Sequence, residues 1–224
     1  MTKPDERTLR EEIVRVCHRL YERGLIAGAE GNVSARLSDG RLLITPAGRA
    51  KIDVSASDLV VIAPSGKGVA GAGRPSSELG MHLRIYERRQ DVGAVVHAHP
   101  PLATAFGVAG EDLMVPVLPE IVVLTGGVPL VPYATPGSVA LADAIEPFLE
   151  HHDAFLMANH GATSLGSNLS IAHERMESLE HAARILLAAR ALGRVTRLTD
   201  SQRDALLALR DAGRASPPDR SGHE

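Results

Sequence analysis

Cysteine is almost absent from this chain, whose 224 residues include only Cys17. A single cysteine cannot form a disulfide within one chain, so a disulfide-stapled fold is excluded. The residues around it are apolar at helical spacing, namely Ile13, Val14, Val16 and Leu20. We therefore expect Cys17 to be a buried helix residue rather than a nucleophile.

Long apolar runs and an excess of one charge are also missing. No segment approaches the roughly 20 apolar residues of a membrane-spanning helix, and the stretch MTKPDERTLREE is charged where a secretory signal would be apolar. The formal net charge is −3, with both signs interspersed, whereas a nucleic-acid-binding surface needs a basic patch. We expect a cytoplasmic protein without a membrane or nucleic-acid partner; a small anionic substrate stays possible.

Helical and strand-like segments alternate along the chain. The pattern predicts helices over residues 7–25, 76–88, 137–149, 169–192 and 200–210 and a short one from 102, with strands over 42–44, 59–62, 92–97, 130–133 and 154–158. Hairpins mixed with helices are typical of a layered α/β domain with a largely antiparallel sheet. We predict one such domain over residues 1–212, and the polar segment 213–224 is predicted to be disordered.

Two histidines stand one residue apart in the stretch AVVHAHPPLA. His97 and His99 share a face of the predicted strand that Pro100 ends, so their side chains converge beside the strand end. His160, in FLMANHGATSLG, likewise follows an apolar strand and is the candidate third ligand. Three imidazoles leave a coordination position open, as catalytic zinc sites do. The alternative is that these are solvated or hydrogen-bonded core histidines.

A carboxylate and an anion site are predicted at one helix start. In GRPSSELGMH, Ser76 or Ser77 is expected to cap a helix and Glu78 to lie just inside its first turn. Free N–H groups at this start, together with Asn32 and the Gly48 loop, form a candidate phosphate pocket. The simpler interpretations are a helix-start acid for Glu78 and an ordinary glycine turn at Gly48.

Another group on the long C-terminal helix imitates a metal site. His173, Glu177 and His181 are spaced four residues apart and share one helix face. Because no HExxH pattern is present, we interpret them as residues that make surface or interface hydrogen bonds.

The ordered motifs GNVS, ITPAG, PSSELGMH, VVHAHPP, PYATPGS and NHGA together resemble the class II aldolase family related to fuculose-phosphate aldolase and ribulose-phosphate 4-epimerase. The similarity covers roughly residues 6–191. It implies a three-layer α/β/α single domain with a central, mainly antiparallel sheet. It also implies a homotetramer with active sites between subunits.

The resemblance implies one divalent metal ion per chain, most often Zn²⁺, with Mn²⁺ or Co²⁺ as alternatives. His97, His99 and His160 match the metal ligands of the family. Glu78 matches the carboxylate that approaches the metal, where it is a possible fourth ligand, and that then acts as the catalytic base. The epimerase branch has aspartate at this position, so Glu78 favours an aldolase.

The resemblance also assigns the phosphate pocket to Asn32, Gly48, Ser76 and Ser77. One departure is Ala47, which stands where some aldolases have a phosphate-binding threonine. That contact would be missing here.

A sharper departure is Glu120 in VPVLPEIVV, which stands where some aldolases contribute a tyrosine from a neighbouring subunit. The C-terminal tyrosine of those enzymes also has no counterpart, because no tyrosine follows Tyr133. We interpret Glu120 as a second catalytic acid–base residue. The alternative is an ion pair across a subunit boundary.

These features predict a metal-dependent lyase of carbohydrate metabolism. The first candidate is an aldolase that cleaves a ketose 1-phosphate to dihydroxyacetone phosphate and an aldehyde. The alternatives on the same metal site are a methylthioribulose-1-phosphate dehydratase-like lyase, a sugar-phosphate 4-epimerase and a decarboxylase. The non-catalytic alternative is a binding module like the head domain of adducin.

Overall fold

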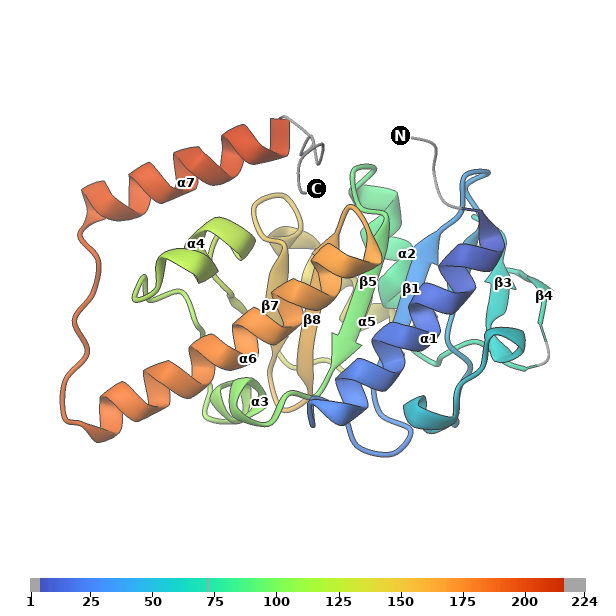
Figure 1. The fold of residues 1–224 in the computed structure, drawn as a ribbon, viewed down its shortest axis with the longest axis horizontal. Helices are drawn as coiled ribbons and strands as arrows, with labels where there is room; N and C mark the ends of the chain where they lie inside the picture. The colour runs from blue at the N-terminus through green and yellow to red at the C-terminus, as the bar shows by residue number, and fades with distance from the viewer. Residues whose placement is uncertain (1–4, 72, 216–224) are drawn as a thin grey trace, which may run out of the picture.

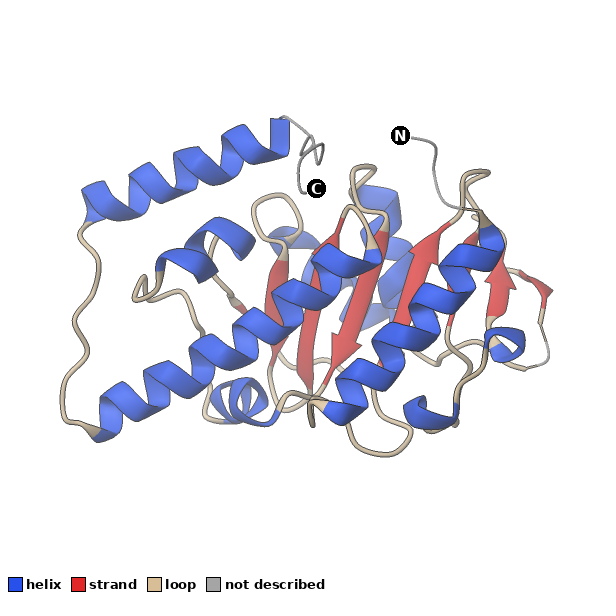
Figure 2. Cartoon of the chain, viewed as in Figure 1, coloured by secondary structure: helices blue, strands red, loops and turns tan. Residues whose placement is uncertain are grey.

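The computed structural model describes residues 5–71 and 73–215. Its centre is an eight-stranded sheet in the order β4-β3-β2-β1-β5-β8-β7-β6, drawn in red in Figure 2. Neighbouring strands are antiparallel except β6 and β7, which are parallel. The strands are β1 (Asn32–Arg36), β2 (Leu42–Ile44), β3 (Val60–Ile62), β4 (Gly68–Ala70), β5 (Ala94–Ala98), β6 (Leu130–Val131), β7 (Ala154–Met157) and β8 (Gly161–Gly166).

Helices cover both faces of this sheet, so the prediction of a three-layer α/β/α domain is confirmed. One apolar core joins the sheet to α1, α3, α4 and α6, and a second core joins the opposite face to α2 and α5; Figure 1 shows α1 and α6 in front of the strands. The helices are α1 (Glu6–Glu22), α2 (Leu79–Arg88), α3 (Pro101–Val108), α4 (Pro119–Thr125), α5 (Val139–Ile145), α6 (Leu169–Ala191) and α7 (Asp200–Ala215), with single 3₁₀ turns at Lys51–Asp53, Ala56–Asp58 and Glu146–Phe148. Within the described residues, no helix combines the length and the apolar character needed to cross a membrane.

The side-chain alternation of the central strand β5 places the functional residues. Val96 belongs to the core beneath α1 and α6, and Val95 belongs to the core beneath α2 and α5. Because side chains alternate along a strand, His97, two residues after Val95, points to the same face of the sheet as Val95. This is the face that α2 covers. Asn32 of β1 lies opposite His97 in the antiparallel ladder. The start of α2 therefore meets the ends of β1 and β5.

One buried carboxylate connects three outer elements. Asp153, just before β7, is almost fully buried. It forms ion pairs with Arg89 at 2.8 Å, with Arg175 of α6 at 3.1 Å and with Arg210 of α7 at 3.1 Å. Arg210 thereby attaches α7, which otherwise packs against α4 (Figure 1).

The structure corrects two sequence predictions. Helix α2 begins at Leu79 with Glu78 as its N-cap residue and without a side-chain cap, so the predicted serine cap is wrong and Glu78 precedes the helix. Helix α7 continues to Ala215, so the first residues of the predicted disordered segment 213–224 are helical. Residues 216–224 lie outside the described part of the chain.

Candidate active site

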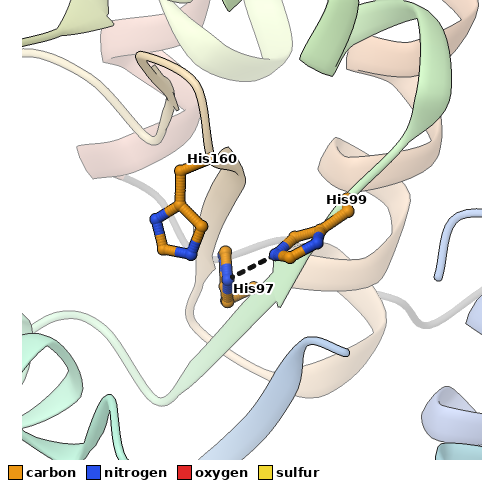
Figure 3. Close-up of side chains that lie close together, drawn as sticks. All are labelled: His97, His99 and His160. Atoms are coloured by element: carbon orange, nitrogen blue, oxygen red, sulfur yellow. Dashed lines mark hydrogen bonds between the residues drawn. The ribbon is translucent and has the colours of Figure 1, made fainter. Parts of the chain in front are cut away.

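Three imidazole rings lie close together where the end of β5 is next to the turn between β7 and β8. The side chains of His97, His99 and His160 each offer a ligand atom, and these atoms lie within 4.8 Å of one another. Figure 3 shows the rings turned toward a common point. The Nε2 atoms of His97 and His99 are 3.2 Å apart. The structure thus brings together the three histidines singled out in the sequence.

His160 reaches this point because the β7–β8 connection is a tight turn. Asn159 adopts a left-handed conformation with φ 54°, and the His160 N–H donates to the Met157 carbonyl at 3.1 Å. The next residue, Gly161, leaves no room for a side chain: a Cβ there would lie 2.5 Å from Cδ2 of His99. Glycine at this position therefore lets the backbone approach the imidazole cluster.

The carboxylate of Glu78 faces the cluster from the start of α2. Its Oε2 lies 3.1 Å from Nε2 of His97, and its Oε1 lies 3.2 Å from Nε2 of His160. Asn32 donates an Nδ2–H to Oε2 at 2.8 Å, whereas Oε1 is buried without a hydrogen-bond partner. Burial raises the pKa of Glu78. The facing His97 and His160 together lower this pKa by a larger amount, so the net pKa of Glu78 lies well below its usual range.

The protonation of His97 fits a metal site. Nδ1 of His97 lies 2.9 Å from the Ala162 carbonyl, which only accepts, so Nδ1 carries the proton. The other ring nitrogen of His97, Nε2, faces Oε2 of Glu78 and Nε2 of His99. Lone pairs that face one another at about 3 Å repel unless a cation or a proton lies between them. The donor set of three imidazoles and one carboxylate suits a divalent cation of the zinc type.

His99 lies at the open side of the cluster, with 25% of its side chain exposed. Burial, followed by the charge of His97, lowers the pKa of His99 to about 4, which keeps the ring neutral and able to bind a cation at neutral pH. Its Nδ1 faces the Glu30 carboxylate at 3.5 Å. Glu30 was not predicted from the sequence, where its position two residues before Asn32 was the available signal.

The loops predicted to bind phosphate lie side by side next to Glu78. The N–H of Ser76 donates to the Thr45 carbonyl, and that of Ala47 donates to the Arg74 carbonyl. Gly48 has φ +69° and open space where a side chain would be. Ser76 is buried with its Oγ accepting from the Glu78 N–H at 3.3 Å, and Ser77 is exposed. A phosphate role for these loops remains a prediction.

The side chain of Asn32 is committed to contacts inside the protein. It lies between Glu78 and His82, with its Oδ1 in a short hydrogen bond to Nε2 of His82. The predicted phosphate contact of Asn32 stays untested, and the observed partner of its amide is the carboxylate of Glu78.

Glu120 occupies a different part of the molecule. It is an exposed residue in the first turn of α4, and it lines a cavity of about 680 Å³ together with Arg23 and with Glu177 and His181 of α6. Within the described residues, no hydrogen bond or ion pair joins Glu120 to Glu78 or the three histidines, and its catalytic role remains a prediction.

The α6 group that imitates a metal site makes hydrogen bonds and ion pairs instead. His173 faces Glu177 at 3.3 Å, and Glu177 also pairs with Arg19 and Arg23 of the α1 region. The one metal-capable group among the described residues is that of His97, His99 and His160.

Comparisons with known proteins agree with this fold. Residues 11–187 match the family model described as the class II aldolase and adducin N-terminal domain. The chain is 36% identical over 185 residues to a 3-oxo-tetronate 4-phosphate decarboxylase of Pectobacterium atrosepticum, covering 81% of this chain and 84% of that protein. It is 34% identical over 175 residues to an L-fuculose phosphate aldolase of Methanococcus maripaludis, covering 78% and 93%. The crystal structure of YgbL from Escherichia coli superposes with a TM-score of 0.85 at 34% identity, covering 90% of this chain and 99% of that one.

The chain belongs to the class II aldolase and adducin family, because the family model spans most of its length. The relatives include lyases that form or break a carbon–carbon bond, among them a decarboxylase and aldolases. The family uses a divalent metal ion, and the histidine group described above could hold one.

Proposed function

We propose that this chain is a metal-dependent lyase that acts on a small phosphorylated substrate with a carbonyl group and cleaves the bond between the carbon beside that carbonyl and the next carbon. The first candidate substrate is a 3-oxo sugar acid phosphate, which loses its carboxylate as CO₂. The observation that carries the proposal is the buried Glu78, which has one oxygen held by Asn32 and the other directed at His160 of the histidine cluster without a hydrogen-bond partner.

His97, His99 and His160 would hold the divalent cation, with Glu78 close enough to approach it. Such a cation, when bound, supplies electrostatic stabilisation of negative charge on the carbonyl oxygen of the substrate. The N–H groups of Ser77 and Gly48 would bind the substrate phosphate, because those of the neighbouring Ser76 and Ala47 already donate to carbonyl groups.

Glu78 serves as the proton carrier. When the C1–C2 bond of a 3-oxo acid breaks, the carboxylate leaves as CO₂ and its electron pair stays on C2, forming an enediolate with the neighbouring carbonyl. Glu78, which is ionised at rest, takes up a proton from solvent and delivers it to C2, which leaves dihydroxyacetone phosphate as the product. A lowered pKa keeps Glu78 ionised at rest, so it also removes that proton in the reverse direction.

Two observations favour decarboxylation. The 3-oxo-tetronate 4-phosphate decarboxylases of Pectobacterium atrosepticum and Escherichia coli are each 36% identical to this chain over 81% of its length. Loss of CO₂ also needs no base to deprotonate a leaving hydroxyl group, and Glu78 is the one carboxylate in contact with both His97 and His160 among the described residues.

Aldol cleavage of a ketose 1-phosphate is the second candidate. It yields the same enediolate with an aldehyde in place of CO₂, and it needs a second acid–base residue for the hydroxyl group of the leaving fragment. Glu120 fills this role in the proposal, and because it lies away from the histidines of its own chain, it would reach the site of a neighbouring subunit in a homotetramer.

A product analysis tests both candidates. Zinc-loaded protein is incubated separately with 3-oxo-tetronate 4-phosphate and with a panel of ketose 1-phosphates, and dihydroxyacetone phosphate, CO₂ and aldehydes are quantified. Release of CO₂ supports the first candidate, and release of an aldehyde supports the second. No dihydroxyacetone phosphate from any substrate would contradict the proposed lyase function.

Glu120→Gln separates the two roles considered for Glu120. A catalytic residue predicts aldehyde release lowered roughly 10²-fold or more with the oligomer intact. An interface ion pair predicts smaller species in light scattering, with activity that follows the amount of intact oligomer.

A further inference from the structure

A chain of hydrogen bonds runs from Glu78 into the core between α2 and β1. Glu78, the N-cap residue of α2, is spaced four residues from His82, which is four residues from Tyr86, and all three lie on one side of this segment. Along β1, Asn32 and Ser34 are two residues apart and point to the same face. The five polar side chains alternate in contact, in the order Glu78, Asn32, His82, Ser34 and Tyr86.

The direction of the first two bonds is dictated by the carboxylate. An ionised Glu78 only accepts, so the Asn32 amide must direct its Nδ2–H at Oε2, where the distance is 2.8 Å. The amide oxygen of Asn32 then faces Nε2 of His82. Because that oxygen also only accepts, Nε2 must carry the ring proton of His82.

The remaining bonds fix the tautomer of His82. The ring is fully buried, and the side chains that contact its two nitrogens, Asn32 and Ser34, are uncharged, so the imidazole is neutral. A neutral imidazole has one N–H, so Nδ1 is an acceptor. The Ser34 hydroxyl donates to Nδ1 at 2.6 Å, and the Tyr86 hydroxyl, 2.9 Å away, supplies a proton to the Ser34 oxygen.

We propose that His82 is a positioning residue whose Nε2–H group fixes the Asn32 amide in the orientation that anchors Glu78 for proton transfer. This inference rests on the proposed function, in which Glu78 carries the proton. Without the His82 donor, the Oδ1 end of the Asn32 amide has no fixed partner, so the amide can move and its Nδ2–H is no longer held on Oε2 of Glu78. A carboxylate that loses this anchor no longer keeps Oε1 directed at the histidine cluster.

Two substitutions of His82 separate positioning from packing. His82→Leu fills much of the space but has no donor, and we expect kcat to fall roughly 10- to 100-fold, as when other orienting partners are removed. His82→Gln keeps an N–H₂ group near the position of Nε2, and we expect it to recover most of that loss. Zinc content should stay near wild type in both variants, because no hydrogen bond joins His82 to His97, His99 or His160 within the described residues.

Ile85→Val provides the matched control. Ile85 is fully buried on the same helix but belongs to the apolar core, so this variant loses stability without touching the hydrogen-bond chain. A merely structural role for His82 predicts that activity follows the folded fraction in all three variants. The positioning role predicts a kcat loss in His82→Leu that is absent from an equally destabilised Ile85→Val.

Two measurements decide the inference without substrate. Nitrogen NMR of ¹⁵N-histidine-labelled protein should show His82 as the neutral Nε2–H tautomer, and a crystal structure of His82→Leu should show the Asn32 amide rotated or withdrawn from Glu78. A protonated Nδ1, or an unchanged Asn32–Glu78 contact in His82→Leu, would overturn the positioning role. Wild-type protein that neither cleaves substrate nor exchanges protons of dihydroxyacetone phosphate would refute the proposed function instead, and these two measurements would still decide the hydrogen-bond geometry.

Discussion

Zinc binding should stabilise the folded chain through the three histidines, and removing one of them should abolish that stabilisation. His99→Ala is the most informative change, because its side chain is partly exposed while His97 is fully buried. Truncation at His99 therefore opens little of the core but removes one of the three converging Nε2 atoms. Any loss of the zinc response then reports on binding rather than on folding.

The magnitude follows from linkage between binding and folding. A ligand that binds only the folded state at 100 times its dissociation constant contributes about 2.7 kcal/mol. In a chain of 224 residues, each kcal/mol shifts the unfolding midpoint by about 2–4 °C. Chelating the metal should therefore lower Tm by about 5–11 °C in wild type, and zinc should restore it. In His99→Ala the same zinc concentration should shift Tm by less than about 2 °C.

Calorimetry at one protein concentration measures these shifts, together with elemental analysis of each sample. His181→Ala is the matched control, because His181 is an exposed histidine of α6 outside the cluster and should keep the full zinc response. Equal zinc responses in wild type, His99→Ala and His160→Ala would refute the assignment of this cluster as the metal site.

Three further outcomes are expected. Glu78→Gln keeps the shape of the side chain but removes the base, so solvent-deuterium incorporation into dihydroxyacetone phosphate should fall roughly 10²-fold or more; wild-type exchange would show that Glu78 is not the proton carrier. Gly161→Ala places a Cβ 2.5 Å from Cδ2 of His99 and should weaken zinc affinity roughly 10-fold or more without removing a ligand, as chelator competition would measure. Because the folded-state pKa of His82 is depressed to about 3, its contribution to stability is complete above pH 6.5 and is lost as the pH falls toward 3. Metal-free protein should lose about 2 kcal/mol through His82 between pH 6.5 and 5, and urea unfolding of His82→Gln should show a shallower pH dependence.

The histidine cluster could be predicted from the sequence because His97, His99 and His160 each lie at or just after the end of an apolar strand. Such a strand is recognised from local sequence alone. The run ending in His97 is buried on both sides, and prolines stop it directly after His99. The strands β1 and β8 escaped prediction because NVSAR and GATSLG consist mostly of small and polar residues. They are strands because they pair with β5 on either side, and such pairing is a tertiary effect that local propensity does not contain.

Four-residue spacing of polar side chains imitated a metal site on α6, whereas the same spacing of Glu78 and His82 was overlooked as part of the candidate active site. One helix face of α6 carries two potential metal ligands and a carboxylate, namely His173, His181 and Glu177. In the structure, Glu177 instead forms ion pairs with arginines of the α1 region. Glu78, the N-cap residue of α2, and His82 have the same four-residue spacing, but only Glu78 was predicted to have a role in the site. The difference lies in what each helix face meets. α6 presents Glu177 to basic side chains near the surface, whereas α2 presents His82 to the polar face of β1, where a fully buried imidazole must find a donor and an acceptor. A four-residue repeat of polar side chains therefore becomes informative about a site only when the opposing strand supplies the complementary partners, as Asn32 does between His82 and Glu78.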